Sequence, residues 1–137
     1  MTDDVTTEVV VDGGCSGPNR RTLLRLCWHR ADPLAVRLIV TCEPDHPALP
    51  RGQWSMLRDF LRYGCEHPTG DGDVQLRPDP TGEHVILQLR QGGPPRYVSV
   101  PVATMHAFLD ATERIVPAGE ERSDEALDAL LERLLRA

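Results

Sequence analysis

The chain has 137 residues, of which 26% are charged, and its formal net charge at pH 7 is −6. This length suits one domain, and the acidic balance disfavours nucleic-acid binding, which needs a basic surface to neutralise phosphates. No run of eighteen apolar residues and no basic N-terminal region are present, so we expect neither membrane insertion nor secretion, and hence a cytoplasmic protein. We expect a single domain over residues 1–137, with flexible segments at 1–4 and 12–20.

Alternating apolar residues predict three strands in the first part of the chain, at 5–11, 22–30 and 34–43. In the third of these segments, Val36 and Leu38 point to one face, while the polar residues between and after them point to the other. A sheet with one covered and one wet face is typical of antiparallel strands.

The segment 53–63 is ambiguous, because Trp54, Leu57 and Leu61 fit the apolar stripe of a helix that begins there. Gly64 follows the segment and fits the left-handed position that ends many helices.

The second half of the chain predicts a meander of strands followed by helices. Proline- and glycine-rich turns separate three strand segments, at 73–77, 83–91 and 96–100. A helix is expected from Pro101, whose missing N–H is harmless in the first turn, to just before Pro117. Including a possible fourth strand, the predicted order is β-β-β-(β)-α-β-β-β-α-α.

The last predicted helix begins at Ser123, which is a good N-terminal cap. Its leucines recur at helical spacing, at Leu127, Leu130, Leu131, Leu134 and Leu135. Such a stripe is typical of a buried core face, and the alternative is packing across a subunit boundary.

The cysteines and histidines suggest no reactive centre. Four cysteines in a cytoplasmic chain are expected to be free thiols. Cys27–His29 and Cys65–His67 each pair a thiol with an imidazole, but neither pair has the spacing of a structural zinc site. Cys42 lies on the apolar face of its strand, where burial makes a thiol inert. We therefore expect no metal, no cofactor and no enzymatic activity.

Two charged features in the middle of the chain have more than one interpretation. Asp71 and Asp73 lie in a turn-rich loop that supplies too few ligands for calcium, so we interpret Asp73 as a turn or strand-start residue. Arg58 and Asp59 have two interpretations. The favoured one is a salt bridge at the start of a helix, and the other is a contact with a partner protein.

Motifs in three segments agree in order and spacing with the SsgA-like proteins, the sporulation and cell-division proteins of morphologically complex actinobacteria. The matching residues are Ala31, Asp32, Pro33, Ala35, Val36, Trp54, Arg58, Asp59, Leu61, Gly64, Pro68, Thr69, Gly70, Gly72, Asp73 and Val74. The chain resembles this family loosely from about residue 23 to 135. It departs from the pattern in the lengthened proline-rich loop at 44–50 and in the residues at 65–67.

The resemblance implies an α+β fold in which helices pack against a strongly curved antiparallel sheet, related to the whirly folds that bind single strands. It also implies a short strand around Trp54 followed by a helix from about Arg58, and a bell-shaped trimer. The candidate site residues are then the central motif residues, as structural elements or partner contacts: Trp54, Arg58, Asp59, Gly64, Pro68, Thr69, Gly70, Gly72 and Asp73.

The function that the resemblance implies is control of sporulation-specific septation by a non-enzymatic, oligomeric scaffold at the septum. Its partners would be the tubulin-like division protein FtsZ or another SsgA-like protein, with no nucleic acid. The alternative function is a single-stranded nucleic-acid-binding protein on a whirly-like sheet, which would need aromatic side chains beside a positive groove.

Overall fold

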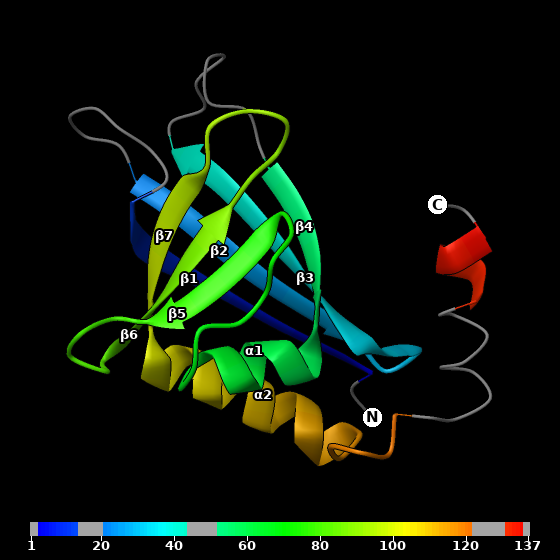
Figure 1. Ribbon diagram of the computed structural model, residues 1–137. Helices are drawn as coiled ribbons and strands as arrows, with labels where there is room; N and C mark the ends of the chain where they lie inside the picture. Colours follow the sequence, from blue (N-terminus) through cyan, green and yellow to red (C-terminus); the bar gives the residue numbers. More distant parts are fainter. Residues whose placement is uncertain (1–2, 14–20, 44–51, 122–130, 136–137) are drawn as a thin grey trace.

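The structure of the protein, a computed structural model, describes residues 3–13, 21–43, 52–121 and 131–135 (Figure 1). Within these ranges four strands precede a short helix, and three strands precede a longer helix. Residues 131–135 are also helical. The predicted order of elements and the α+β class are confirmed.

The seven strands form one antiparallel sheet in the order β4-β3-β2-β1-β7-β6-β5. Their bounds are β1 (Asp4–Gly13), β2 (Arg21–His29), β3 (Asp32–Glu43), β4 (Gly52–Leu57), β5 (Val74–Pro78), β6 (His84–Leu89) and β7 (Arg96–Pro101). Cα atoms of β4 and β5, the two edge strands, approach within 8 Å of one another. The sheet therefore curls until its edges nearly meet, which confirms the strong curvature expected from the resemblance.

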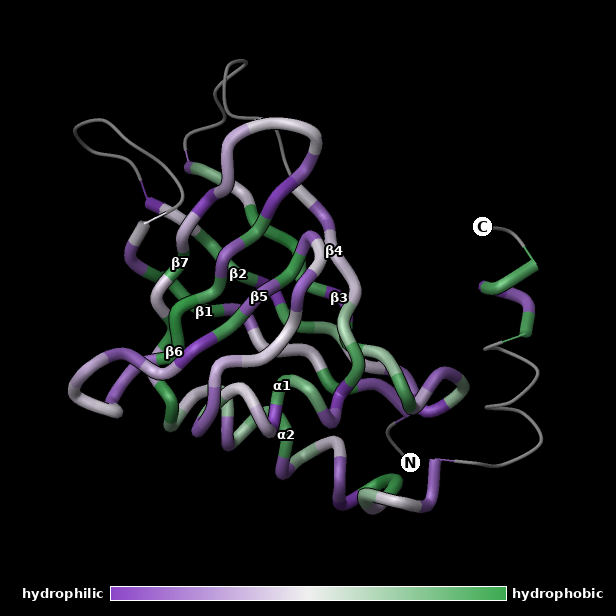
Figure 2. Tube along the Cα trace, in the orientation of Figure 1, coloured by the Kyte–Doolittle hydropathy of each residue, from purple (hydrophilic) through white to green (hydrophobic). Residues whose placement is uncertain are grey.

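Two helices lie together against the curved sheet, α1 (Arg58–Gly64) and α2 (Val102–Ile115) (Figure 1). Apolar and polar residues alternate along the strands, because successive side chains point to opposite faces (Figure 2). The inner faces and the helices share one core, whose fully buried members include Leu24, Leu26, Val36, Leu38, Val40, Leu61, Leu87, Leu89, Met105, Phe108 and Leu109.

The ambiguous segment 53–63 is a strand followed by a helix. Trp54 and Met56 are buried while Gln53 and Ser55 are exposed, which is the period of a strand. Each β4 residue pairs with β3, and α1 then begins at Arg58. The helical stripe predicted from Trp54 is wrong, whereas the strand and helix implied by the family resemblance are confirmed.

Gly64 does not have the left-handed conformation that we predicted from its position. It is the last residue of α1 and is buried, and its φ is not among the positive values found at other glycines. A Cβ at Gly64 would lie 2.4 Å from Cδ1 of Leu76 in β5. Glycine is therefore needed for the close approach of α1 to the sheet.

Some expectations for the chain ends concern residues outside the described ranges. β1 includes Asp4 and Gly13, so the strand is longer than expected, and of the segments expected to be flexible, 1–2 and 14–20 are not described. The expected cap Ser123 also lies outside the description, as do the first two leucines of the predicted stripe.

The described part of the last helix does not contribute to the core. The exposed fractions of Leu131, Leu134 and Leu135 are 55%, 64% and 84%. The interpretation of these three leucines as core residues is wrong, and the alternative of packing across a subunit boundary remains for them.

Candidate functional site

The corner where β4 passes into α1 is held by a buried ion pair. Arg58, the first residue of α1, is only 1% exposed, and its Nη2 lies 2.6 Å from Oε1 of Glu121. Its Nη1 donates to Oγ1 of Thr112 at 3.3 Å, and its guanidinium carbon lies 5.5 Å from the ring centroid of Trp28. One side chain thus joins α1 to α2, to the segment after α2 and to β2.

The pair is stable in its ionised form. Burial raises the pKa of the Glu121 carboxyl, but the hydrogen bond and charge of Arg58 outweigh this effect, and the net pKa is lowered. The backbone N–H of Gly119 also donates to Oε2 of Glu121 at 2.8 Å. Arg58 therefore has a structural partner 63 residues later in the chain, while Asp59, the partner next to it in sequence, is exposed.

A second arginine joins the two helices at the surface. Nη2 of Arg62 lies 2.7 Å from Asp110 and 2.8 Å from Glu113, both in α2. Burial lowers the pKa of Arg62, but the hydrogen bonds to these two carboxylates outweigh it, so the net pKa is raised. This pairing is partly exposed and provides a natural comparison with the buried Arg58 pair.

Trp54 connects β4 to the opposite side of the sheet. Its ring is buried in the core, and its Nε1 donates to the carbonyl oxygen of Arg90 at 2.8 Å. The backbone N–H of Arg90 in turn donates to the carbonyl oxygen of Asp73 at 2.9 Å. Trp54 thus ties the β4 edge to the loops that flank β5 and β6.

The loop before β5 is shaped by its backbone. Thr69 and Leu76 exchange two backbone hydrogen bonds of 2.8 and 2.9 Å. Gly70 has a φ of 94°, and a Cβ there would lie 2.4 Å from the carbonyl oxygen of Val74, so this turn requires glycine. Gly72 by contrast faces open space.

Between β4 and this loop lies a groove of about 480 Å³. It is lined by Gln53, Trp54, Ser55, Met56, Leu57, Phe60, Gly70, Asp71, Gly72, Asp73 and Val74. The structure therefore brings Trp54, Gly70, Gly72 and Asp73 of the predicted site together. The other predicted site residues, Arg58, Asp59, Gly64, Pro68 and Thr69, do not line this groove.

One thiol and one imidazole of the pairs considered above, those of Cys65 and His29, are engaged in structural contacts. Burial raises the pKa of Cys65 to about 11, and its Sγ lies 3.2 Å from the carbonyl oxygen of Leu61. Nε2 of His29 lies 3.0 Å from Asp4, and its Nδ1 accepts from the N–H of Ala31. Both ring nitrogens of this histidine are therefore occupied.

The expectation that all four cysteines are free is corrected at one position, because Cys42 is disulfide-bonded, whereas Cys27 and Cys65 are free. Within the described ranges, no three residues among the histidines, cysteines, aspartates and glutamates group closely enough to hold a metal ion. The same ranges contain no helix long and apolar enough to cross a membrane.

The aromatic side chains are divided between core and surface. Trp28, Trp54 and Phe108 are buried, whereas Phe60 and Tyr63 are exposed on α1 and Tyr97 is exposed on β7. On the outer face of the sheet, Arg25 is paired with Glu8 and Arg21 with Glu43. Among the residues that the structure describes, no observation favours the aromatic platform beside a positive groove that single-strand binding needs.

Sequence reasoning missed the residues that complete the site. Glu121 lies in an acidic stretch after Pro117, and nothing local distinguishes it from its exposed neighbour Glu120. Thr112 lies among the buried residues of α2, and a hydroxyl on a buried helical face was the one available signal of an internal polar contact.

The fold and this site define a small α+β protein whose central sequence motif shapes a curved sheet and the groove beside it. The family model described as "Streptomyces sporulation and cell division protein, SsgA" matches residues 23–121. The chain therefore belongs to the SsgA family of sporulation and cell division proteins.

Individual relatives agree with this assignment over most of the chain. The sporulation-specific cell division protein SsgB of Frankia casuarinae is 31% identical, and the alignment covers 98% of this chain and 91% of the relative. SsgB of Streptomyces coelicolor is 28% identical over 80% of this chain and 79% of its own.

The fold is also similar to solved structures. The crystal structure of an SsgA-like sporulation-specific cell division protein from Thermobifida fusca matches with a TM-score of 0.73 and 27% identity, covering 98% of this chain and 96% of that one. A structure from work on SsgB and longitudinal cell division in Streptomyces coelicolor matches with a TM-score of 0.71 and 26% identity, covering 86% and 92%.

Proposed function

We propose that this protein is a non-enzymatic interaction module that controls sporulation-specific septation as an oligomeric scaffold. The proposal is supported by the positions of the motif residues. Trp54 and Arg58 brace the fold, and the loop at 68–73 shapes an open groove. A rigid body with a shaped, accessible surface suits recognition of another protein.

The chemistry of the described residues supports a non-catalytic role. The thiol of Cys65 has a pKa of about 11, so little of it is the reactive thiolate at neutral pH. Arg58 and its partners Thr112 and Glu121 are almost fully buried, so this polar network is not accessible to a substrate.

A homo-oligomer, which we propose is a trimer, would explain the exposed leucines of the last helix. Burial of Leu131, Leu134 and Leu135 between subunits would contribute about 5–8 kcal/mol to association before entropic costs. Several copies of one surface would then bind a polymeric partner through multivalency. We propose that this partner is FtsZ or another SsgA-like protein, and that binding occurs at the septum.

The proposal is tested by a fluorescent fusion of the full chain in a sporulating actinobacterium that lacks the native copy. Septal foci and normal spore chains are expected, and a diffuse signal with normal septation would refute the proposed role. Sedimentation of the purified protein tests the trimer. A monomer at micromolar concentration would refute the trimer, and a trimer that persists in Leu134→Asp would refute the assignment of the exposed leucines to its interface.

A further inference from the structure

We propose that the groove between β4 and residues 70–74 binds an extended, basic segment of a partner protein, which adds to the sheet along the β4 edge. This inference rests on the proposed function, because it assigns the chemistry of the partner that the interaction module recognises.

The sheet has an edge at β4. Among the described strands, β4 is the last at one side and pairs only with β3, from Gly52 to Leu57. In an antiparallel pair, alternate residues turn their N–H and C=O groups away from the partner strand. No other described backbone group hydrogen-bonds to β4. These outward groups are therefore a template for a further strand.

The edge at β4 opens into a groove. The groove of about 480 Å³ runs beside residues 53–57 and is bounded on its other side by residues 70–74. Five residues of strand span about 17 Å, which matches a short extended segment. Cα atoms of β4 and β5 approach within 8 Å of one another, so the segment lies beside β4 only where the groove is open.

An apolar surface lies at one end of the groove. Leu57 and Phe60 line the groove and are exposed, and Tyr63 follows one turn later on α1. Residues three apart on a helix are neighbours, so Phe60 and Tyr63 form a continuous surface. The ring of Tyr63 is stacked on His67 at a centroid distance of 4.6 Å, which holds it in place.

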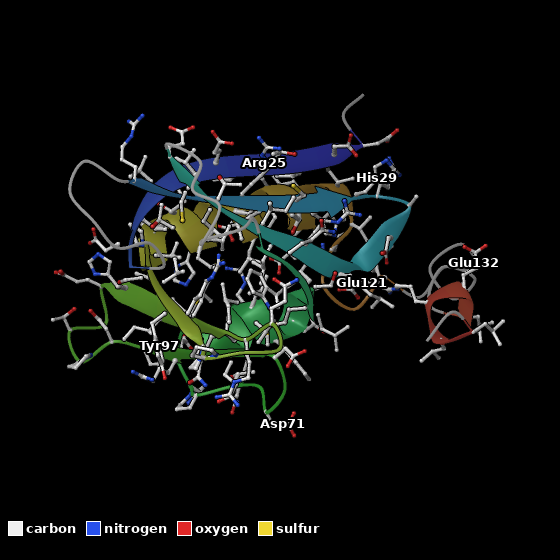
Figure 3. The ribbon with its side chains drawn as sticks, turned by 90° about the horizontal axis from the view of Figure 1, so that it is seen from above. Arg25, His29, Asp71, Tyr97, Glu121 and Glu132 are labelled. Carbon is white, nitrogen blue, oxygen red and sulfur yellow. The ribbon has the colours of Figure 1, made fainter. Side chains whose placement is uncertain are left out.

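Acidic side chains lie around the groove. Asp59, Asp71 and Asp73 are exposed, and no described residue forms an ion pair with any of them. Asp71 projects from the tip of its loop into solvent (Figure 3). Arg90 is the cation whose backbone meets this loop. These three acidic side chains without an ion-pair partner favour a segment in which apolar residues alternate with arginine or lysine.

The probe for this site is a fluorescein-labelled nine-residue peptide in which valine alternates with arginine, and fluorescence anisotropy measures its binding to the full chain. We expect saturable binding that weakens about tenfold or more when glutamate replaces the arginines. We expect a similar loss when the peptide's backbone amides are methylated, because these can no longer donate to the β4 edge. Hydrogen exchange should slow over residues 53–57 when the peptide binds.

Variants on the surface locate the interaction without disturbing the core. Phe60→Ser and Asp71→Lys should each weaken peptide binding at least fivefold. Tyr97→Ser is the matched control, because this aromatic residue is 49% exposed on β7 compared with 45% for Phe60, and it should bind within about twofold of the wild type. Equal binding of the glutamate or methylated peptide, or unchanged exchange over 53–57, would overturn the proposal.

The fluorescent fusion separates this inference from the proposed function. If wild-type protein forms septal foci and Phe60→Ser and Asp71→Lys lose them, both hold. If the two variants keep normal foci while wild type forms them, the groove is not the partner site although the proposed function stands. If wild type forms no foci, the proposed function fails, and the peptide experiment alone then decides the chemistry of the groove.

Discussion

Replacement of Arg58 by methionine should destabilise the protein strongly, because it leaves the carboxylate of Glu121 buried without its partner. Arg58 is 1% exposed and ties α1 to two later segments. Removing one member of such a buried pair costs about 3–5 kcal/mol. This is a large part of the ~5–15 kcal/mol that stabilises a typical domain, and it corresponds to a fall in Tm of about 10–20 °C.

The measurement is urea unfolding followed by tryptophan emission, since Trp28 and Trp54 are both buried in the native protein. A double-mutant cycle with Glu121→Leu separates the pair from the packing around it. The double variant Arg58→Met with Glu121→Leu should recover most of the lost stability, because no unpaired charge remains buried. Thr112 keeps its own hydrogen bond to the carbonyl oxygen of Leu109.

Arg62→Met is the matched control for this experiment. Arg62 lies in the same helix and contacts two carboxylates, but its side chain is partly exposed, and exposed pairs contribute only about 0.2–1 kcal/mol. If Arg58→Met costs no more than Arg62→Met, or if the double variant is as unstable as the sum of the single variants, the assigned role of the buried pair is wrong.

Three further predictions concern other positions. Gly64→Ala should cost about 1–3 kcal/mol because its Cβ would displace a side chain of β5, whereas Gly72→Ala faces open space and should change urea stability by less than about 0.5 kcal/mol. Folding lowers the pKa of Glu121, so the carboxylate's contribution to the free energy of unfolding is present above the unfolded pKa and is lost as pH falls through the lower folded pKa. Glu121→Gln should therefore be less stable than wild type at pH 7, and the difference in stability should shrink below about pH 4. Because burial raises the Cys65 pKa to about 11, iodoacetamide at pH 8 should alkylate Cys27 first in the native protein, and equal rates by mass spectrometry would contradict this.

The strands were predictable because their signal is local. The alternation of Val36, Leu38 and Val40 with polar or half-buried residues states directly which face is covered. The strand and helix at 53–63 were not predictable from periodicity alone, since Trp54, Leu57 and Leu61 fit a helical stripe as well. Pairing of β4 with β3 decides the conformation there, and that pairing is a long-range contact.

The contacts that complete the site depend on the tertiary fold and leave little trace in the sequence. Glu121 meets Arg58 only because the chain returns past α1 after α2. The position of Gly64 after an apolar stripe predicts a left-handed helix end, because glycine is common there. The need for glycine instead comes from the nearby side chain of Leu76, which is distant in sequence. The exposed Leu134 shows the same limit, since helical spacing identifies a stripe without identifying what covers it.

The two bracing residues of the motif, Trp54 and Arg58, both fix the position of β4 beside the groove. Trp54 ties the β4 edge to the backbone at Arg90, and Arg58 fixes the helix that follows β4. The position of the edge relative to the loop therefore depends on both, although Arg58 itself does not line the groove. A substitution of Arg58 should lower stability and partner binding together, whereas a substitution of Phe60 should lower binding at unchanged stability. This separation distinguishes residues that build the surface from those that touch the partner.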